Sequence, residues 1–324
     1  MLTLPDAWAW DFWLADDGEL FHLFYLNAPR ELGDPELRHR AAGVGHAVST
    51  DLRSWELLPE ALAAGEPGGP DDLAIWTGCV VRPGPGAHWH MFYTGTTDVG
   101  GELVQSTCLA TSPDLGTWTR EPGNPVLRAD PRWYEVLGES WPGEHWRDPW
   151  VYSDPDGDGW HMLLTARART GPDDDRGVVG AAWSPDLRRW EARPPRSAPG
   201  AGFGQLEVMQ RELVDGRAVL LFSCLRPELS AARAATVRTG GVWAVTAPPG
   251  NEPFDVATAR LLLDDRFYVG RLVRDHAGRH RSGHDAPDQW MLLAFHNRGP
   301  DGTFVGEISD PMPVGMTPEG LRLA

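Results

Sequence analysis

The sequence lacks the features of membrane, secreted and disulfide-rich proteins. No segment approaches the roughly 18 consecutive apolar residues of a membrane span, and the N-terminus has no positively charged stretch followed by an apolar run. We therefore expect a cytoplasmic protein. Only three cysteines are present, Cys79, Cys108 and Cys224. Their odd number and wide spacing disfavour a disulfide framework or a zinc site, so we expect buried, reduced thiols.

Positive charge is also scarce. Lysine is absent, and 29 arginines face 46 acidic residues, which gives a formal net charge of -17. A field of this sign repels phosphate backbones and anionic lipids, so we expect neither a nucleic-acid partner nor a membrane partner. A hydrophobic content of 41% excludes disorder as a description of the whole chain. The chain is instead rich in glycine (37), proline (29) and tryptophan (16), which is typical of many short strands joined by turns.

Two short elements recur along the sequence. The first is an apolar, aromatic strand, found at 21–28, 89–96, 160–167, 218–225 and 290–297. The second is a strand of small residues that leads into Ser-x-Asp-Leu-x-x-Trp, found at 45–59, 108–122 and 180–194, with weaker copies at 240–249 and 305–314. Its Ser and Asp side chains can cap local backbone N–H groups, and its Trp can pack back on the sheet.

The repeats predict the fold. Five copies leave about 65 residues each, enough for a four-stranded blade, and one such unit cannot bury its own faces. We predict an all-β protein, a five-bladed β-propeller that forms a single domain over residues 1–324 with no C-terminal β-sandwich. A β-sandwich with coincidental turns is the alternative, and three close copies of the turn disfavour it.

Three acidic residues mark a candidate site. Asp11 (in WAWDFW), Asp148 (in HWRDPW) and Glu207 (in FGQLEVMQ) precede repeated strands, at what we take to be the same point of three blades. Innermost strands line the central channel of a propeller, and a carboxylate among apolar neighbours is costly to bury unless it is paired or functional. Singly, each has a structural explanation, Asp148 as a partner of Arg147; together they indicate a site. The turn acids are assigned to structure: Asp51, Asp114 and Asp186.

Aromatic residues near these acids suit a sugar ligand, because flat rings cover the apolar faces of a sugar while carboxylates carry out the chemistry. We expect a small-molecule sugar substrate and no cofactor. Candidates for the sugar-facing wall, each of which could instead be an ordinary core aromatic, are Trp10, Trp13, Trp76, Trp146 and Tyr268. Arg147 is a candidate for binding a sugar hydroxyl and for keeping Asp148 ionised.

Two patterns suggest metal ions and are rejected. His276, His280 and His284 repeat every four residues, but Gly278 and Gly283 and the absence of an apolar stripe predict a solvated loop rather than a helix. The segment 154–159 (DPDGDG) resembles the start of a calcium loop without the rest of that pattern, so a hairpin turn explains it better. We predict no metal site.

Several longer motifs resemble one group of enzymes. FHLFYLNAP with VGHAVSTDLRSWELLPEAL, IWTGCVV at 75–81, WRDPWV at 146–151 and DDRFYVGRL at 264–272 are similar to segments of glycoside hydrolase families 32 and 68. These families are the five-bladed β-fructofuranosidases, invertases and levansucrases. Around Asp11 the sequence resembles the WDSW motif of family 68 more than the family 32 opening, and around Glu207 neither family's motif is kept.

The resemblance implies a reaction. It places Asp11 on the nucleophile, Asp148 on the transition-state stabiliser and Glu207 on the general acid/base of a retaining hydrolase or transglycosidase for a small β-fructofuranoside-like substrate. The apolar neighbours Leu206, Val208 and Met209 favour the neutral carboxylic acid that a proton donor needs. Two alternatives stay open: an inverting enzyme like the family 43 arabinosidases and xylosidases, and a non-catalytic sugar-binding propeller.

Overall fold

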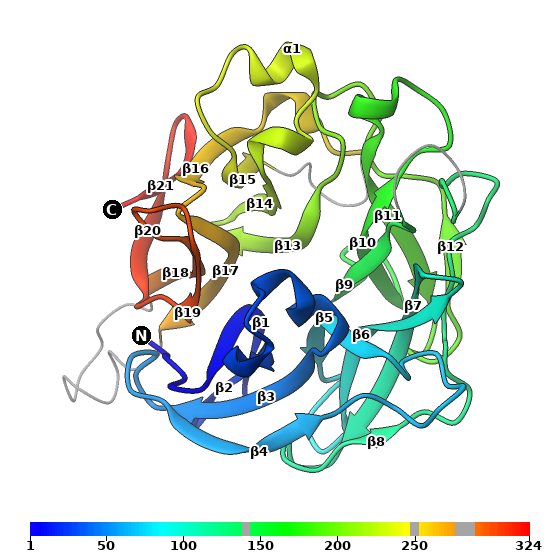
Figure 1. Ribbon diagram of the computed structural model, residues 1–324. Coiled ribbons are helices and arrows are strands. Elements are labelled where there is room, and N and C mark those ends of the chain that lie inside the picture. Colours follow the sequence, from blue (N-terminus) through cyan, green and yellow to red (C-terminus); the bar gives the residue numbers. More distant parts are fainter. Residues whose placement is uncertain (138–142, 247–252, 276–288) are drawn as a thin grey trace.

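The computed structural model describes residues 1–137, 143–246, 253–275 and 289–324 (Figure 1). In these residues the strands form five antiparallel sheets, four of four strands and one of five. Blade one holds β1 (Ala7–Asp16), β2 (Phe21–Pro29), β3 (Gly43–Ser49) and β4 (Glu56–Leu62). Blade two holds β5 (Ala74–Val81), β6 (Trp89–Val99), β7 (Glu102–Ser112) and β8 (Thr119–Arg120). Blade three holds β9 (Trp146–Ser153), β10 (Trp160–Arg167), β11 (Gly177–Ser184) and β12 (Glu191–Arg193).

The remaining two blades complete the ring. Blade four holds β13 (Glu207–Val214), β14 (Arg217–Cys224), β15 (Gly241–Thr246) and β16 (Arg260–Asp264). Blade five holds β17 (Phe267–Asp275), β18 (Gln289–Arg298), β19 (Phe304–Ile308), β20 (Met312–Thr317) and β21 (Gly320–Leu323). Helices are short: α1 (Ala231–Ala234) and the 3₁₀ turns η1 (Arg30–Leu32), η2 (Pro35–Arg40), η3 (Asp173–Asp175), η4 (Arg226–Glu228) and η5 (Val256–Thr258). No helix in the described ranges is long and apolar enough to span a bilayer.

The five-bladed β-propeller predicted from the sequence is confirmed. The innermost strands β1, β5, β9, β13 and β17 contact one another in turn around the centre (Figure 1). The first repeated element is the second strand of each blade, and the clear copies of the second element are the third strands β3, β7 and β11. The N-terminus closes the ring, because Leu2 and Ile308 exchange two backbone hydrogen bonds of 2.9 and 3.0 Å.

The Ser-x-Asp-Leu turns have the structural role expected of them. In blade one, the Ser49 hydroxyl accepts the Asp51 N–H (3.0 Å), and Asp51 Oδ1 accepts the N–H groups of Arg53 and Ser54 at 2.8 and 2.7 Å. Asp114 and Asp186 repeat this pattern. The leucine of each turn is buried with a positive φ of 60–65°, which fixes the reversal of the chain: Leu52, Leu115 and Leu187.

Every innermost strand carries a bulge at the same level of the channel. The pairing shifts after Trp10, Trp76, Arg147, Glu207 and Tyr268, so these five residues occupy equivalent positions. Asp11 and Asp148 come one residue later. The expectation that all three acids share one position is therefore wrong for Glu207, which is equivalent to Arg147 rather than to Asp148. A bulge re-aims side chains, which is why both adjacent positions can face the channel.

Second-strand hydroxyls tie three bulges to the preceding blade. Thr94 Oγ1 accepts the N–H of Asp148 (2.9 Å), Thr165 Oγ1 accepts that of Val208 (3.2 Å) and Ser223 Oγ accepts that of Val269 (3.0 Å). The three donors have φ of 57°, 53° and 51°, a region that valine rarely occupies. These bonds between blades stabilise the unusual backbone that carries the site.

Two smaller predictions are also confirmed. Cys79, Cys108 and Cys224 are buried and free. Residues 154–159 form the hairpin between β9 and β10, closed by the Asp154 N–H to Gly159 carbonyl bond of 2.9 Å. The segment with His276, His280 and His284 lies outside the described residues.

Candidate active site

A pocket of about 460 Å³ opens at the N-terminal ends of the innermost strands. Six of the nine residues singled out from the sequence line it: Trp10, Asp11, Trp76, Arg147, Asp148 and Glu207. The three carboxylates come from blades one, three and four, which are far apart in sequence. The pocket is where the ring brings them together.

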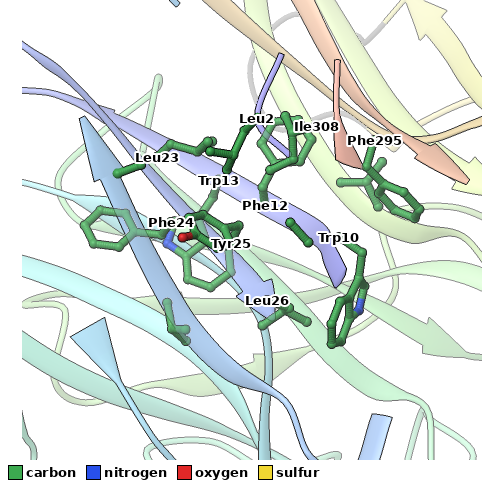
Figure 2. Packing of buried hydrophobic residues seen from close by; sticks show 14 of the residues in the cluster. Leu2, Trp10, Phe12, Trp13, Leu23, Phe24, Tyr25, Leu26, Phe295 and Ile308 are labelled. Atoms are coloured by element: carbon green, nitrogen blue, oxygen red, sulfur yellow. The ribbon is translucent and has the colours of Figure 1, made fainter. Parts of the chain in front are cut away.

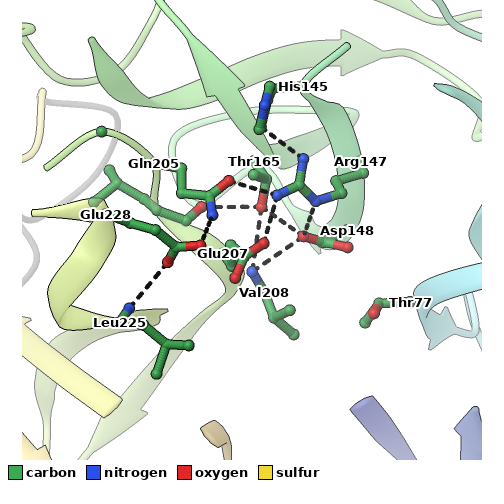
Figure 3. Close-up of polar contacts among 12 residues, drawn as sticks. Thr77, His145, Arg147, Asp148, Thr165, Gln205, Glu207, Val208, Leu225 and Glu228 are labelled. Atoms are coloured by element: carbon green, nitrogen blue, oxygen red, sulfur yellow. Dashed lines mark hydrogen bonds and ion pairs between the residues drawn. The ribbon is translucent and has the colours of Figure 1, made fainter. Parts of the chain in front are cut away.

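Arg147 links two of the carboxylates (Figure 3). Its Nη2 donates to Glu207 Oε1 at 2.5 Å, and its Nε lies 3.4 Å from Asp148 Oδ2. Burial alone would lower the pKa of Arg147, but the charges of Glu207 and Asp148 outweigh it and the pKa is raised. A permanently charged guanidinium therefore holds the acids of blades three and four in one cluster.

Tyr268 completes the surroundings of Glu207. Its hydroxyl donates to Glu207 Oε2, and burial together with the charge of Glu207 raises the pKa of Tyr268 well above 10, so it stays a neutral donor. The expectation that apolar side chains surround the Glu207 carboxyl is wrong. Leu206 and Val208 are buried in the core, and the carboxyl accepts hydrogen bonds from Arg147 and Tyr268. Tyr268 is 8% exposed and contacts the acid instead of lining the pocket.

Asp11 lies across the pocket in a different environment. Its Oδ2 accepts a hydrogen bond of 2.5 Å from the Thr77 hydroxyl. Burial, followed by the charge of Asp148, raises the pKa of Asp11 from its ordinary value of 3.8 to about 7, with Thr77 and Arg38 acting in the opposite direction. Asp11 therefore exchanges its proton close to neutral pH.

Asp148 is the most enclosed of the three acids. Its Oδ2 accepts the Thr165 hydroxyl at 2.7 Å and the Val208 N–H at 3.3 Å. Burial raises the pKa of Asp148, while the Arg147 guanidinium opposes that shift. Asp148 is therefore a buried part of the pocket wall, with two hydrogen-bond donors around one of its oxygens.

A second layer of polar side chains orients Arg147 (Figure 3). His145 Nδ1 accepts from Nη1 at 2.8 Å, and Gln205 Oε1 accepts from Nη2 at 2.7 Å. The amide of Gln205 is oriented in turn by Glu228, whose Oε1 accepts from Nε2 at 2.6 Å. Burial and the nearby Glu207 raise the pKa of Glu228 to about 7. The arginine is therefore fixed by a chain of side chains that reaches η4.

An aromatic wall covers the side of the pocket next to blade one. The ring of His39, on η2, meets both Trp10 and Trp76 edge-to-face, with centroids 6.4 and 5.9 Å away. Trp76 Nε1 also donates to the His39 carbonyl at 2.7 Å. Burial lowers the pKa of His39 to about 3, with Arg38 adding to the effect, so the ring is neutral at physiological pH.

Two predicted wall residues lie elsewhere. Trp13 is fully buried, past the bulge of β1, and stacks on its cross-strand partner Phe24 at 6.2 Å (Figure 2). Trp146 is also fully buried and packs on Tyr134 with ring centroids 4.8 Å apart. Trp146 precedes Arg147, and successive strand side chains point to opposite faces, so the arginine reaches the pocket and the indole enters the core. Their assignment to the sugar-facing wall is corrected.

Sequence reasoning missed several residues of the site. Thr77 lies in the motif IWTGCVV, at the position of blade two equivalent to Asp11, so the repeat alignment could have found it. His39 and Glu228 occur in connecting segments with no repeat or motif around them, and Gln205 lies two residues before Glu207 in the segment FGQLEVMQ, where nothing marks it as a contact of Arg147. Only their spatial contacts reveal them.

Comparison with known protein families shows which family the chain belongs to. The model of the glycosyl hydrolases family 32 N-terminal domain matches residues 14–240. The chain belongs to glycosyl hydrolase family 32. The matched range includes Asp148 and Glu207 and begins just after Asp11. The family is that of the β-fructofuranosidase-like glycoside hydrolases, as the sequence motifs indicated.

Curated relatives of this family 32 chain include hydrolases and a transferase. It is 33% identical over 170 residues to acid β-fructofuranosidase 1 of a Rosa hybrid cultivar, covering 49% of this chain and 26% of that protein. It is 29% identical over 208 residues to sucrose:sucrose 1-fructosyltransferase of Festuca arundinacea, covering 61% of this chain and 28% of that protein. The matches thus span little more than a quarter of these relatives.

Solved structures share the fold over the whole chain. An inulosucrase from Halalkalicoccus jeotgali, bound to kestose, superposes with a TM-score of 0.76 at 18% identity, covering 100% of this chain and 90% of that chain. A Bombyx mori family 32 β-fructofuranosidase gives a TM-score of 0.73 at 20% identity, covering 100% and 64%.

Proposed function

We propose that this chain cleaves, or transfers, the β-fructofuranosyl unit of a small fructoside with retention of configuration. The observation that supports this most directly is the pocket itself, which gathers Asp11, Asp148 and Glu207 from three blades around one space of sugar size. Relatives that act on or bind sucrose and kestose, by their names, favour fructosides as the substrate class.

In this proposal Asp11 is the nucleophile. Its carboxylate attacks the anomeric carbon as the glycosidic carbon–oxygen bond breaks, and the leaving oxygen takes a proton from Glu207. Water then attacks the same carbon, gives a proton to Glu207 and displaces Asp11; a sugar hydroxyl in place of water gives transfer. Because the pKa of Asp11 is about 7, we expect activity to rise as the pH passes from mildly acidic to neutral.

Asp148 supports the charge that develops on the sugar, and Arg147 holds Asp148 in position. The sugar ring becomes positive as its bond breaks, and a fixed carboxylate beside it stabilises that charge. Thr165 and Arg147 hold Asp148 in place, so little reorganisation is needed at the moment of reaction. Trp10 and Trp76 supply the apolar wall for the sugar face.

Asp11→Asn and Glu207→Gln test the proposal. With sucrose or 1-kestose as substrate, each is expected to lower kcat by at least about 1,000-fold with the circular dichroism spectrum unchanged. Asp16→Asn and Glu212→Gln are matched controls, since they change acids on the same two strands but at the opposite end of the channel. Near-full activity of either catalytic variant would remove that residue from the mechanism.

Two further results separate the alternatives. The first-formed anomer of fructose, followed by NMR, is β for a retaining enzyme and α for an inverting enzyme of the family 43 kind. Binding of sucrose and 1-kestose by calorimetry without any turnover would instead support a non-catalytic sugar-binding propeller.

A further inference from the structure

The central channel has a second end. A cavity of about 220 Å³ lies at the C-terminal ends of the innermost strands, opposite the active-site pocket. Strand β1 contributes Trp10 and Asp11 to the pocket but Ala15 and Asp16 to this cavity, and β13 contributes Glu207 to one and Glu212 to the other. A buried group between the two ends can therefore contact the strands that carry the proposed catalytic carboxylates.

Arg271 is such a group. It is the first paired residue after the bulge of β17, and the side chain is 1% exposed. Its Nε donates to the Phe12 carbonyl at 3.0 Å and its Nη1 to the Met209 carbonyl at 2.8 Å. The guanidinium also lies 5.1 Å from the ring centre of Trp150. One side chain of blade five therefore contacts blades one, three and four.

The two carbonyls belong to the strands that carry the proposed nucleophile and acid/base. Phe12 directly follows Asp11, and Met209 lies two residues after Glu207, each inside or beside a bulge. A bulged strand has lost part of its ladder, so its position is less well fixed by its own sheet. A rigid, planar donor that holds both carbonyls sets how far apart these two strands lie.

Arg271 is a buried cation close to the acids of the channel. Burial lowers the pKa of Arg271 to about 10, with Cys79, Asp148, Asp11 and Glu212 opposing the shift, so the side chain is a cation at neutral pH. Its Nη2 has no hydrogen-bond partner among the described residues, and Arg271 lines the second cavity. A buried cation of this kind is costly, and local stability alone does not require one.

We propose that Arg271 is a positioning residue for the reaction: by bridging the carbonyls of Phe12 and Met209 it fixes the separation of Asp11 and Glu207. This inference rests on the proposed fructoside chemistry. It assigns Arg271 no contact with the sugar, because Arg271 does not line the active-site pocket.

The test uses Arg271→Gln, Arg271→Lys and Arg271→Ala in the full chain, with sucrose or 1-kestose. A displacement of about 1 Å between reacting groups can cost on the order of 100-fold, so we expect kcat of Arg271→Gln to fall by that amount while KM stays within about twofold. Arg274→Met is the matched control, since Arg274 lies on the same strand and lines the same cavity, with its guanidinium over Trp290. It should retain wild-type kcat.

Rescue gives a sharper readout. Arg271→Ala leaves a space next to an existing cavity, so millimolar guanidinium, far below unfolding concentrations, is expected to restore kcat, whereas equal concentrations of sodium chloride or urea are not. Arg271→Lys, which keeps the charge but cannot bridge both carbonyls, should have an intermediate kcat.

The structure of Arg271→Gln supplies a readout that needs no activity. We expect β1 and β13 to change their separation at Phe12 and Met209 relative to the wild type. Wild-type kcat in the folded variants, unchanged strands, or failure of all three variants to fold would each overturn the positioning role. An inactive wild type would instead refute the proposed function, and the strand separation would still decide whether Arg271 sets the geometry.

Discussion

The Thr77 hydroxyl donates a hydrogen bond of 2.5 Å to Asp11 Oδ2, from the position of blade two that corresponds to Asp11 itself in blade one. The bulge of β1 thus supplies the carboxylate, and the equivalent bulge of β5 supplies the hydroxyl that donates to it. The bond favours the ionised acid and opposes the burial that raises the pKa of Asp11 to about 7. Thr77 therefore increases the ionised fraction of Asp11, the proposed nucleophile, near neutral pH.

Thr77→Val should move the acid limb of the pH–rate profile upward. Without the hydroxyl, the pKa of Asp11 rises further, and we expect the limb of kcat/KM to move by roughly one pH unit. Activity should fall most at pH 6 and recover toward pH 9. Thr77→Ser keeps the donor and serves as control. An unchanged limb in Thr77→Val would show that another group governs it.

Asp11→Asn should be inactive but more stable at alkaline pH. The folded state raises the pKa of Asp11 from 3.8 to about 7, so ionising it costs folding free energy as the pH rises through this interval. Asparagine removes that cost and can still accept the Thr77 bond. We expect a gain in unfolding free energy on the order of a few kcal/mol at pH 8 that disappears near pH 4. Urea denaturation at both pH values measures it; an equal effect at both would contradict the linkage.

Thr165→Val should weaken both the fold and the site. It loses the donor to Asp148 (2.7 Å) and the acceptor of the Val208 N–H (3.2 Å), which leaves a buried N–H group poorly satisfied. We expect a loss of about 1–3 kcal/mol in unfolding free energy, together with reduced kcat. Ser223→Ala breaks only the equivalent bond to Val269 and should lower stability with less effect on kcat. Equal losses of kcat in the two variants would argue against a specific role for Thr165.

Substitutions of Trp76 and Trp13 should have different effects, the first on substrate binding and the second on the stability of the fold. Trp76→Phe loses the Nε1 bond to His39 and part of the pocket wall, so KM should rise by about tenfold with little change in melting temperature. Trp13→Ala removes a fully buried side chain and should cost about 3–5 kcal/mol of stability without a comparable change in KM. A raised KM with unchanged stability in Trp13→Ala would instead show that Trp13 belongs to the sugar-facing wall.

The sequence by itself determined the propeller and the strands that carry its acids. A blade is a local unit whose alternation of apolar residues and turn chemistry repeats in the chain, so the copies at 45–59, 108–122 and 180–194 could be recognised without coordinates. The repeats also predict the strands of Asp11, Asp148 and Glu207, because each of these acids lies on the strand that precedes a repeated strand.

Only the tertiary structure decided what those acids contact. Relative to the bulge of its strand, Glu207 occupies the position of Arg147, one residue before that of Asp148. On β1, Trp10 before the bulge lines the pocket, whereas Trp13 after the bulge lies in the core. The partners Thr77, Tyr268 and Arg271 reach across blades that lie far apart along the chain. Contacts between separate blades depend on register and on ring closure, which no local pattern of residues encodes.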